Sequence, residues 1–308
     1  MKIYINKIKE NWIVDRYKED WNNQYPDLKT NYLFNADIYW IIAPWTLKKF
    51  KSRPLKNIKT ICTIHHIDPL TFDVSNFKIM DEFIDFYHVI STQTFKELKK
   101  LTNKKIYFIP WWVDDSLWFN IPDKEFLRGY FDLKSDDYLI GSFQRDTEGS
   151  DLTSPKLIKG PDIFFEIIKN KYIKNKNLKV ILAGTRRQYL IKRLTESSIP
   201  FKYFELVDNK ELNMLYNTLD LYIVASRIEG GPQAILECAI SKTPIISSNV
   251  GIAKEILNSK SIFNVNANLI EIEYCKPDIE YAFKNALSFK KDIRMNEFLN
   301  MFNEIYES

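Results

Sequence analysis

The sequence predicts an α/β protein made of two Rossmann-like domains, each built on a parallel sheet. Short apolar runs alternate with helical patterns along the chain, which is typical of βαβ units whose sheets are covered by helices on both faces. The length of 308 residues is that of two average domains. The apolar fraction of 45% and the charged fraction of 27% are those of an ordinary globular protein, so a disordered chain is excluded.

The first series of elements predicts a domain over residues 1–117. Its predicted strands are Lys2–Ile5, Asp37–Ile42, Ile58–Ile64, Tyr87–Ser91 and Lys105–Ile109. Its predicted helices are Ile13–Asn23, Phe77–Phe86 and Thr94–Leu101. Residues 118–136 lack strand patterning and contain one polar helix candidate, Asp123–Phe131, so we interpret this segment as a connector.

The second series predicts a domain over residues 137–292. Its predicted strands are Tyr138–Phe143, Val180–Ala183, Phe201–Glu205, Leu221–Val224 and Pro244–Ser247. Its predicted helices are Pro161–Ile173, Gln188–Glu196, Asn209–Thr218, Pro232–Ser241, Ala253–Asn258 and Ile279–Ser288. A last helix, Arg294–Tyr306 within 293–308, is a candidate to pack back on the first domain. Because ligands of such sheets bind beyond the carboxyl ends of the strands, we expect the two domains to face a cleft there.

The net charge of +4 is unevenly distributed, since residues 1–120 hold 18 Lys and Arg against 14 Asp and Glu. The excess lies in Lys48, Lys49, Lys51, Arg53, Lys56 and Lys59. A solvated helix end or loop explains this run, and a patch for anionic phospholipid or a polyanionic acceptor is the alternative. The weak overall charge disfavours binding to duplex nucleic acid.

Cysteine usage and the first residues predict a cytoplasmic protein. Cys62, Cys238 and Cys275 are odd in number and widely spaced, so they form neither a disulfide framework nor a metal motif. Met1–Trp12 carries charges and no apolar segment, so we see no secretory signal. No apolar stretch approaches the roughly 20 residues that a bilayer requires.

The segment Ala225–Glu237 carries the clearest chemistry. It follows a buried strand, passes through Gly230-Gly231 and starts a helix at Pro232, where the missing amide hydrogen of proline costs least. The backbone amides of Gln233 and Ala234 are then free at the positive end of the helix dipole, which makes an anion site.

Two carboxylates flank this anion site, Glu229 in the loop and Glu237 on the helix. A carboxylate accepts two hydroxyl donors at once, so the pair suits sugar and ribose hydroxyls rather than a diphosphate. The alternative is a plain turn with a solvated Glu237. The apolar neighbours of Glu237 argue against it, because Leu236, Cys238 and Ala239 indicate a buried helix.

The motif S-R-x-E-G-G-P-x-x-x-x-E, with Glu229 and Glu237 as its acids, resembles the nucleotide-sugar motif of retaining glycosyltransferases of family 4. These enzymes have the GT-B fold. Further matches follow in the family's order, and the resemblance covers Ile58–Leu257. They are Ile109–Asp114, Leu182–Thr185, Glu211–Asp220, and Asn249-Val250-Gly251 with Glu255.

The resemblance implies that a basic pair grips the donor diphosphate. Arg145, after the strand Tyr138–Phe143, matches the arginine, and Lys159 before Gly160-Pro161 matches the lysine. Fixed cations there would stabilise the leaving nucleoside diphosphate as its charge grows. Thr147–Ile158 is longer than the usual separation and contains Lys156, which is the alternative lysine. Glu237 is implied to hold the ribose, and Glu229 with the helix amides to position the sugar.

In the first domain, Thr63–Asp68 resembles the family's strand-end histidine near the transferred sugar. His65 aligns best, and because adjacent strand residues point to opposite sides, only one of His65 and His66 can face the cleft. A structural role is the alternative for both. We predict no metal site, since neighbouring strand residues cannot chelate one ion and no Asp-x-Asp motif is present.

One departure concerns the acceptor side. Members of the family carry a glycine-rich loop after the first strand, whereas this chain has no glycine before Gly129. Bulky side chains in its place prevent close backbone approach, and Asn11 or Arg16 is the candidate substitute.

The sequence therefore predicts a cytoplasmic, metal-independent, retaining glycosyltransferase. A peripheral location at the inner face of a membrane, through Lys48–Lys59, is the alternative. Its expected partners are a UDP- or GDP-linked sugar donor and a glycan or lipid-linked acceptor, with no cofactor and no nucleic acid. The resemblance implies front-face attack, in which the leaving phosphate takes the acceptor's proton. The alternatives are a nucleotide-sugar epimerase, a phosphorylase or a non-catalytic carbohydrate-binding relative.

Overall fold

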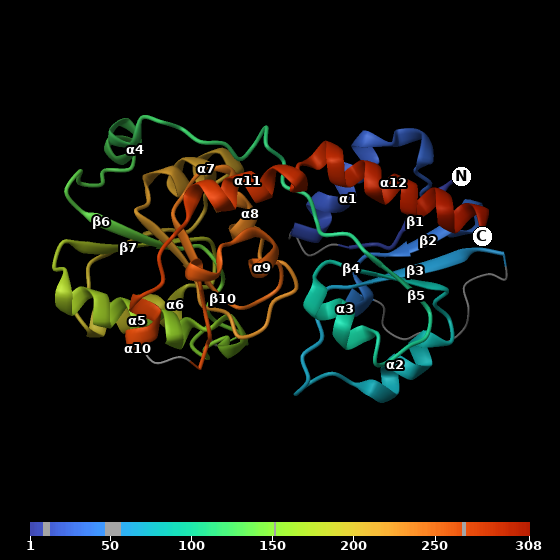
Figure 1. Cartoon of the computed structure of the whole chain (residues 1–308), viewed down its shortest axis with the longest axis horizontal. Coiled ribbons are helices and arrows are strands. Elements are labelled where there is room, and N and C mark those ends of the chain that lie inside the picture. The colour runs from blue at the N-terminus through green and yellow to red at the C-terminus, as the bar shows by residue number, and fades with distance from the viewer. Residues whose placement is uncertain (9–12, 47–56, 151, 267–268) are drawn as a thin grey trace. The chain divides into compact units, whose positions relative to one another are not determined.

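The computed structural model describes residues 1–8, 13–46, 57–150, 152–266 and 269–308, and it divides the chain into two domains. The first domain holds Met1–Trp111 and Asp292–Ser308, and the second holds Trp112–Lys291. The division therefore falls after Trp111 and not at 117, and the segment 118–136 lies within the second domain. The prediction of two α/β domains with parallel sheets is confirmed (Figure 1).

The described residues of the first domain form a five-stranded parallel sheet with the order β1-β2-β3-β4-β5. The strands are β1 (Ile3–Ile5), β2 (Ile38–Ile41), β3 (Lys59–Ile64), β4 (Phe86–Val89) and β5 (Lys105–Phe108). The helices are α1 (Ile13–Gln24), α2 (Val74–Asp81), α3 (Thr92–Leu98) and α12 (Lys291–Glu307). Asp73 and Ser91 cap the amino ends of α2 and α3, each through its side chain.

Alternate residues of β2 face two different cores, as the pleat of a strand requires. Tyr39 and Ile41 pack with the apolar residues of α2 and α3. Trp40 on the opposite face meets Phe298 and Phe302, with ring centroids 5.6 and 5.1 Å apart. This aromatic contact places the C-terminal helix α12 on the sheet of the first domain.

The described residues of the second domain form a six-stranded parallel sheet with the order β11-β10-β9-β6-β7-β8. The strands are β6 (Tyr138–Ser142), β7 (Leu178–Ala183), β8 (Phe201–Phe204), β9 (Leu221–Val224), β10 (Ile245–Ser248) and β11 (Ile262–Phe263). The helices are α4 (Lys124–Tyr130), α5 (Pro161–Lys174), α6 (Gln188–Glu196), α7 (Asn209–Thr218), α8 (Gln233–Ile240), α9 (Ala253–Ile256), α10 (Leu269–Glu273) and α11 (Ile279–Ala286).

Two cores cover the two faces of this second sheet. Leu139 and Ile181 belong to the core beneath α7, α8 and α11. Their neighbours Ile140 and Val180 belong to the core beneath α5 and α6. Figure 1 shows these two groups of helices on opposite sides of the strands. Burial on both faces explains why the strands are continuous apolar runs in the sequence.

The strand order reverses between β6 and β9, which are neighbours in the sheet. The chain leaves β6 toward β7 and β8, and from β9 it continues toward β10 and β11. In a doubly wound sheet, the loops that follow two such strands diverge and leave a crevice at the carboxyl edge. The loops after β6 and β9 are therefore the place in the second domain where such sheets usually bind a ligand.

Several details differ from the sequence prediction. The helix predicted at Phe77–Phe86 is α2 at Val74–Asp81, and Phe86 begins β4. The strand β11 and the helix α10 were not predicted, because two residues of strand and five of helix leave no periodic pattern. Pro232 is the N-cap residue of α8, so the helix begins at Gln233 and not at Pro232 as predicted. Among the described residues, no helix combines the length and the apolar character needed to cross a bilayer.

His88 lies in a fully buried hydrogen-bonded chain on β4. The indole Nε1 of Trp40 donates to Thr63 Oγ1 at 2.9 Å, and this oxygen lies 3.0 Å from His88 Nδ1. The Nε2 of His88 is 2.8 Å from the carbonyl of Ile109. The network assigns a neutral ring that donates from Nε2 and accepts at Nδ1. Burial lowers the pKa of His88 to about 3.

His88 should make the first domain less stable in mild acid. Between pH 6.5 and about 3, the unfolded chain binds a proton that the folded chain excludes, so stability falls as pH falls through this window. The contribution to the slope is at most about 1.4 kcal/mol per pH unit. His88→Gln keeps polar groups but does not titrate, so urea unfolding at pH 7 and pH 5 should show a shallower loss of stability. An equal loss in both proteins would contradict this account.

Candidate active site

The predicted site residues of the second domain come from the loops after β6 and β9. Arg145 lies in the first loop, is exposed and has no ion-pair partner among the described residues. Its neighbour Asp146 is 1% exposed and pairs with the fully buried Arg187, with Oδ2 and Nε 2.9 Å apart. This buried pair fixes the backbone next to Arg145, while the guanidinium of Arg145 remains open to a ligand.

The loop that follows Arg145 makes an excursion and returns. Thr147 forms an antiparallel bridge with Pro155, and the amide of Glu148 donates to the carbonyl of Ser154 at 2.9 Å. The amide of Lys156 then donates to the carbonyl of Asp146 at 2.8 Å. The return brings Lys156 back beside Arg145, which explains the unusual sequence separation.

Backbone hydrogen bonds bring the three predicted cations together. The amide of Lys159 donates to the carbonyl of Lys156 at 2.8 Å, and the amide of Lys156 donates to the carbonyl of Asp146, the neighbour of Arg145. Burial lowers the pKa of Lys156, and the charges of Arg145 and Lys159 lower it further. Glu229 and Glu148 act in the opposite direction. The three side chains therefore form a cation cluster (Arg145, Lys156 and Lys159) at the carboxyl edge of the sheet, in which the described residues leave Lys156 without a hydrogen-bonded acid.

Lys159 is positioned by the glycine that follows it. Gly160 has φ +63°, and a Cβ there would lie 1.8 Å from the carbonyl oxygen of Ala225. Only glycine allows the loop to pack this closely on the end of β9. Pro161 then opens α5, so Lys159 is fixed beside the residues that follow β9.

Lys159 and Glu229 form an ion pair, and both are largely buried, with exposed side-chain fractions of 20% and 12%. Ser226 donates to the same Glu229 oxygen at 3.2 Å, and its hydroxyl also lies 3.3 Å from Gln144 Oε1. The structure thus joins a residue predicted to bind phosphate to one predicted to bind sugar. A ligand in this crevice must contact both ends of the pair or separate them.

The start of α8 offers unpaired polar groups. The amides of Gln233 and Ala234 have no hydrogen-bond acceptor within the described ranges. The side-chain amide of Gln233 is also unpartnered there, although its Oε1 and Nε2 are buried. Buried polar groups are normally satisfied, so this end of α8 is suited to a polar ligand. Gly251, with φ +52°, packs on Gly230 and braces the turn.

Glu237 lies deeper, with 6% of its surface exposed. Its Oε2 accepts a hydrogen bond of 2.9 Å from the hydroxyl of Tyr216 on α7. Burial and the charge of Glu237 raise the pKa of Tyr216, so this hydroxyl remains a donor. Tyr216 was not singled out from the sequence, because only the fold brings α7 and α8 together.

The histidines of the first domain differ in exposure. His66 is exposed, whereas the ring of His65 packs against Trp45 and Trp111 at centroid distances of 5.1 and 5.8 Å. The Nε2 of His65 is 2.8 Å from the carbonyl of Ile42. Burial lowers the pKa of His65 to about 4, so near neutral pH the ring is uncharged and cannot serve as a general acid.

Some predicted features fall elsewhere. Arg16 is on α1 and partly exposed, whereas Asn11 lies outside the described residues. The predicted basic run also lies outside them, except for Lys59 on β3. Within the described ranges, no cluster of three or more His, Cys, Asp or Glu side chains could hold a metal ion.

Part of the second domain is similar to a known protein family. Residues 152–275 match the family model described as glycosyl transferases group 1. No curated protein matches the sequence. The resemblance to glycosyltransferases that the motifs predict is confirmed at the level of the group 1 family model.

Solved structures confirm the GT-B fold. HepE from Anabaena, in complex with UDP and glucose, has a TM-score of 0.78 at 14% identity over 99% of this chain and 100% of its own. Sucrose-phosphate synthase from Thermosynechococcus elongatus has a TM-score of 0.72 at 12% identity, over 98% of this chain and 81% of its own. A glycosyltransferase from Rickettsia africae has a TM-score of 0.67 at 17% identity, over 97% and 83%.

The cation cluster should bind inorganic diphosphate. Removing one charge, as in Arg145→Ala, Lys156→Met or Lys159→Met, should weaken binding about tenfold, the effect of losing one charged hydrogen bond. Calorimetry at fixed ionic strength measures it. Because Lys159→Met leaves Glu229 without its ion-pair partner, the measurement is repeated on the double variant that carries both Lys159→Met and Glu229→Gln. Lys210→Met, at the exposed start of α7, is the control and should bind as the wild type. Equal affinities throughout would refute the cluster as a phosphate site.

Proposed function

We propose that this protein, whose residues 152–275 match group 1 glycosyltransferases, is a retaining enzyme that uses a nucleoside-diphosphate sugar. It transfers the sugar to a hydroxyl group of a glycan, a lipid-linked acceptor or another acceptor. The observation that carries this proposal is the cation cluster at the reversal point of a parallel sheet. Arg145, Lys156 and Lys159, of which Lys159 pairs with Glu229, give this place a positive charge that suits a diphosphate gaining negative charge as the glycosidic bond breaks.

Glu237 suits the ribose. Tyr216 holds Oε2 of Glu237 in place, and a carboxylate can accept two hydroxyl donors at once. Phosphate would be repelled by this charge, so the nucleotide is oriented with its ribose toward Glu237 and its diphosphate toward the cation cluster.

The sugar then lies beside Glu229, the α8 amides and the side-chain amide of Gln233. These groups include both acceptors and donors, which matches the hydroxyl pattern of a hexose. His65 is proposed to contact the sugar from the first domain through its Nδ1, for which the described residues offer no hydrogen-bond partner. Burial lowers the pKa of His65 to about 4, so the ring is uncharged and a weak base near neutral pH, and its proposed role is to position the sugar. The acceptor's proton goes to the leaving phosphate, as front-face attack requires.

The proposal also covers the base of the donor nucleotide, the absence of a metal requirement and a cytoplasmic location. UDP is favoured over GDP because HepE was solved with UDP. Arg145, Lys156 and Lys159 supply the charge that a divalent cation provides in other transferases, so we propose a metal-independent reaction. The three free cysteines suit the cytoplasm.

Nucleotide sugars should stabilise the protein and be turned over. UDP and UDP-sugars at 100 times their Kd should add about 2.7 kcal/mol to stability, which a thermal shift measures. Arg145→Ala and Lys159→Met should lower turnover by about 10²–10³ with folding intact. Product analysis separates the alternatives: an epimerised free nucleotide sugar, or transfer that depends on phosphate, would reject the transferase. Binding without turnover of any donor would favour a non-catalytic relative.

Tyr216 should set the preference for ribose. Tyr216→Phe removes only the hydroxyl, so Glu237 can rotate away from the ribose. UDP should bind about tenfold more weakly, the loss expected for one hydrogen bond to a charged group. The affinity for 2′-deoxy-UDP and for 3′-deoxy-UDP should fall less than the affinity for UDP, so the variant should discriminate less between ribose and deoxyribose than the wild type does. A uniform loss for all three nucleotides would indicate a merely structural role for Tyr216.

A further inference from the structure

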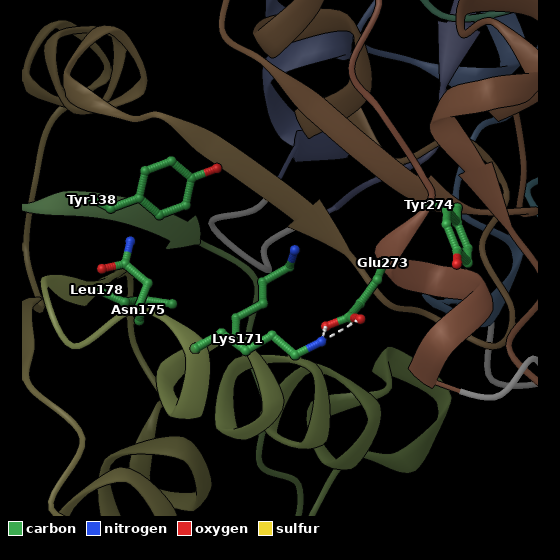
Figure 2. Close-up of a pocket in the computed structure, with 7 residues that line it drawn as sticks. Tyr138, Lys171, Asn175, Leu178, Glu273 and Tyr274 are labelled. Carbon is green, nitrogen blue, oxygen red and sulfur yellow. Dashed lines mark hydrogen bonds and ion pairs between the residues drawn. The ribbon is translucent and has the colours of Figure 1, made fainter.

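A cavity of about 440 Å³ lies at the edge of the second sheet opposite the candidate active site. Tyr138 and Leu178 begin β6 and β7 and are paired in register, so the cavity is at the amino ends of these strands. Its lining comes from these strands and from the carboxyl ends of α5 and α10 (Figure 2). The lining residues are Tyr138, Lys171, Lys174, Asn175, Leu178, Glu273 and Tyr274. The volume lies within the range of small-molecule sites.

Lys171 brings an uncompensated charge into this cavity. It is partly buried, and no side chain among the described residues forms an ion pair or a hydrogen bond with its ammonium group. Burial lowers the pKa of Lys171, even though the charge of Glu273 acts to raise it. Figure 2 shows this side chain extended between Tyr138 and Glu273. A partly desolvated cation without a partner gains most from a bound anion.

Glu273 does not satisfy Lys171, because it is already engaged. Both of its oxygens accept from Lys174, and Oε1 also accepts from Asn170 at 2.8 Å. The hydrogen bond from Lys174 lowers the pKa of Glu273, so the carboxylate stays ionised. Two lysines and one carboxylate leave the lining with a charge of +1. This charge attracts an anionic ligand.

The remaining lining groups indicate what kind of molecule carries the anionic group. Figure 2 shows Tyr138 on one side of Lys171 and Tyr274 farther along the lining, beyond Glu273, and the ring of Tyr274 is 77% exposed. A tyrosine ring packs on the apolar face of another ring, and its hydroxyl bonds to polar substituents. The amide of Asn175 adds a donor and an acceptor. Flat apolar surfaces ringed by hydroxyl and amide groups suit a saturated ring with hydroxyl substituents.

We propose that this cavity binds an anionic sugar, that is, a sugar ring bearing one carboxylate or one phosphate. Lys171 pairs with the anion, and the ring lies on Tyr274 with its hydroxyls toward Tyr138 and Asn175. The site is separate from the cation cluster, which lies at the carboxyl edge of the same sheet. It therefore gives the protein a second point of contact with a carbohydrate, independent of the donor.

In the test, the whole chain is titrated with glucuronate, glucose 6-phosphate, glucose and inorganic phosphate. Calorimetry or ligand-observed NMR measures the affinity for each. The two anionic sugars should bind at least tenfold more tightly than glucose or phosphate. Lys171→Met should weaken both about tenfold, as expected for one charged hydrogen bond. Lys210→Met should leave them unchanged. Tyr274→Ala should weaken the sugar phosphate and not inorganic phosphate.

Three outcomes would overturn the proposal. These are equal binding of glucose and glucuronate, wild-type affinity in Lys171→Met, and phosphate binding as tight as that of glucose 6-phosphate, which would leave a simple anion site. UDP is titrated in the same proteins, and its affinity should not change in Lys171→Met. If the wild type binds the anionic sugars but not UDP, the proposed function is refuted and this site is not. If the wild type binds UDP but not the anionic sugars, this site is refuted and the proposed function is not.

Discussion

The ion pair between Asp146 and Arg187 is the constraint on which the candidate active site depends. Both residues are buried, and the guanidinium also donates to the carbonyls of Ser142 and Ala183, at the ends of β6 and β7. The carbonyl of Asp146 in turn receives the amide of Lys156. Burial raises the pKa of Asp146, so without Arg187 this carboxyl would be costly to ionise. A pair of this kind stabilises little by itself, but it specifies one arrangement of two strand ends and a loop.

Most of the fold could be predicted because burial leaves a periodic trace in the sequence. β3 and β9 are apolar runs, and α5 starts at a proline after a glycine, so their positions follow from local rules. The sequence also predicts that the last helix packs back on the first domain, and the structure places it there, but the sequence does not predict the contacts that hold α12. Its contact with β2 depends on Trp40 meeting Phe298 and Phe302, and a pairing of aromatic residues so distant in the chain has no local signature.

The candidate site likewise contains residues that the sequence predicts and contacts between them that it does not. Arg145, Lys159 and Glu229 were found because the loops after parallel strands are where ligands bind and because their motif is ordered along the chain. The ion pair between Lys159 and Glu229 was not foreseen, since it depends on the close approach of Gly160 to Ala225. Tyr216 was missed for a related reason: its hydroxyl matters only through a carboxylate on another helix. Sequence identifies charged groups more readily than it identifies their partners.

The excursion after Asp146 closes on itself through the bridge between Thr147 and Pro155. Its two ends are therefore held at a fixed separation whatever the number of residues between them. Insertions or deletions at the tip would be absorbed as a longer or shorter hairpin, at a small entropic cost that grows slowly with length. Evolution can thus remodel this tip while the spacing of Arg145 and Lys156 in three dimensions stays constant, so distance along the chain is a poor guide to homologous positions in this part of the protein.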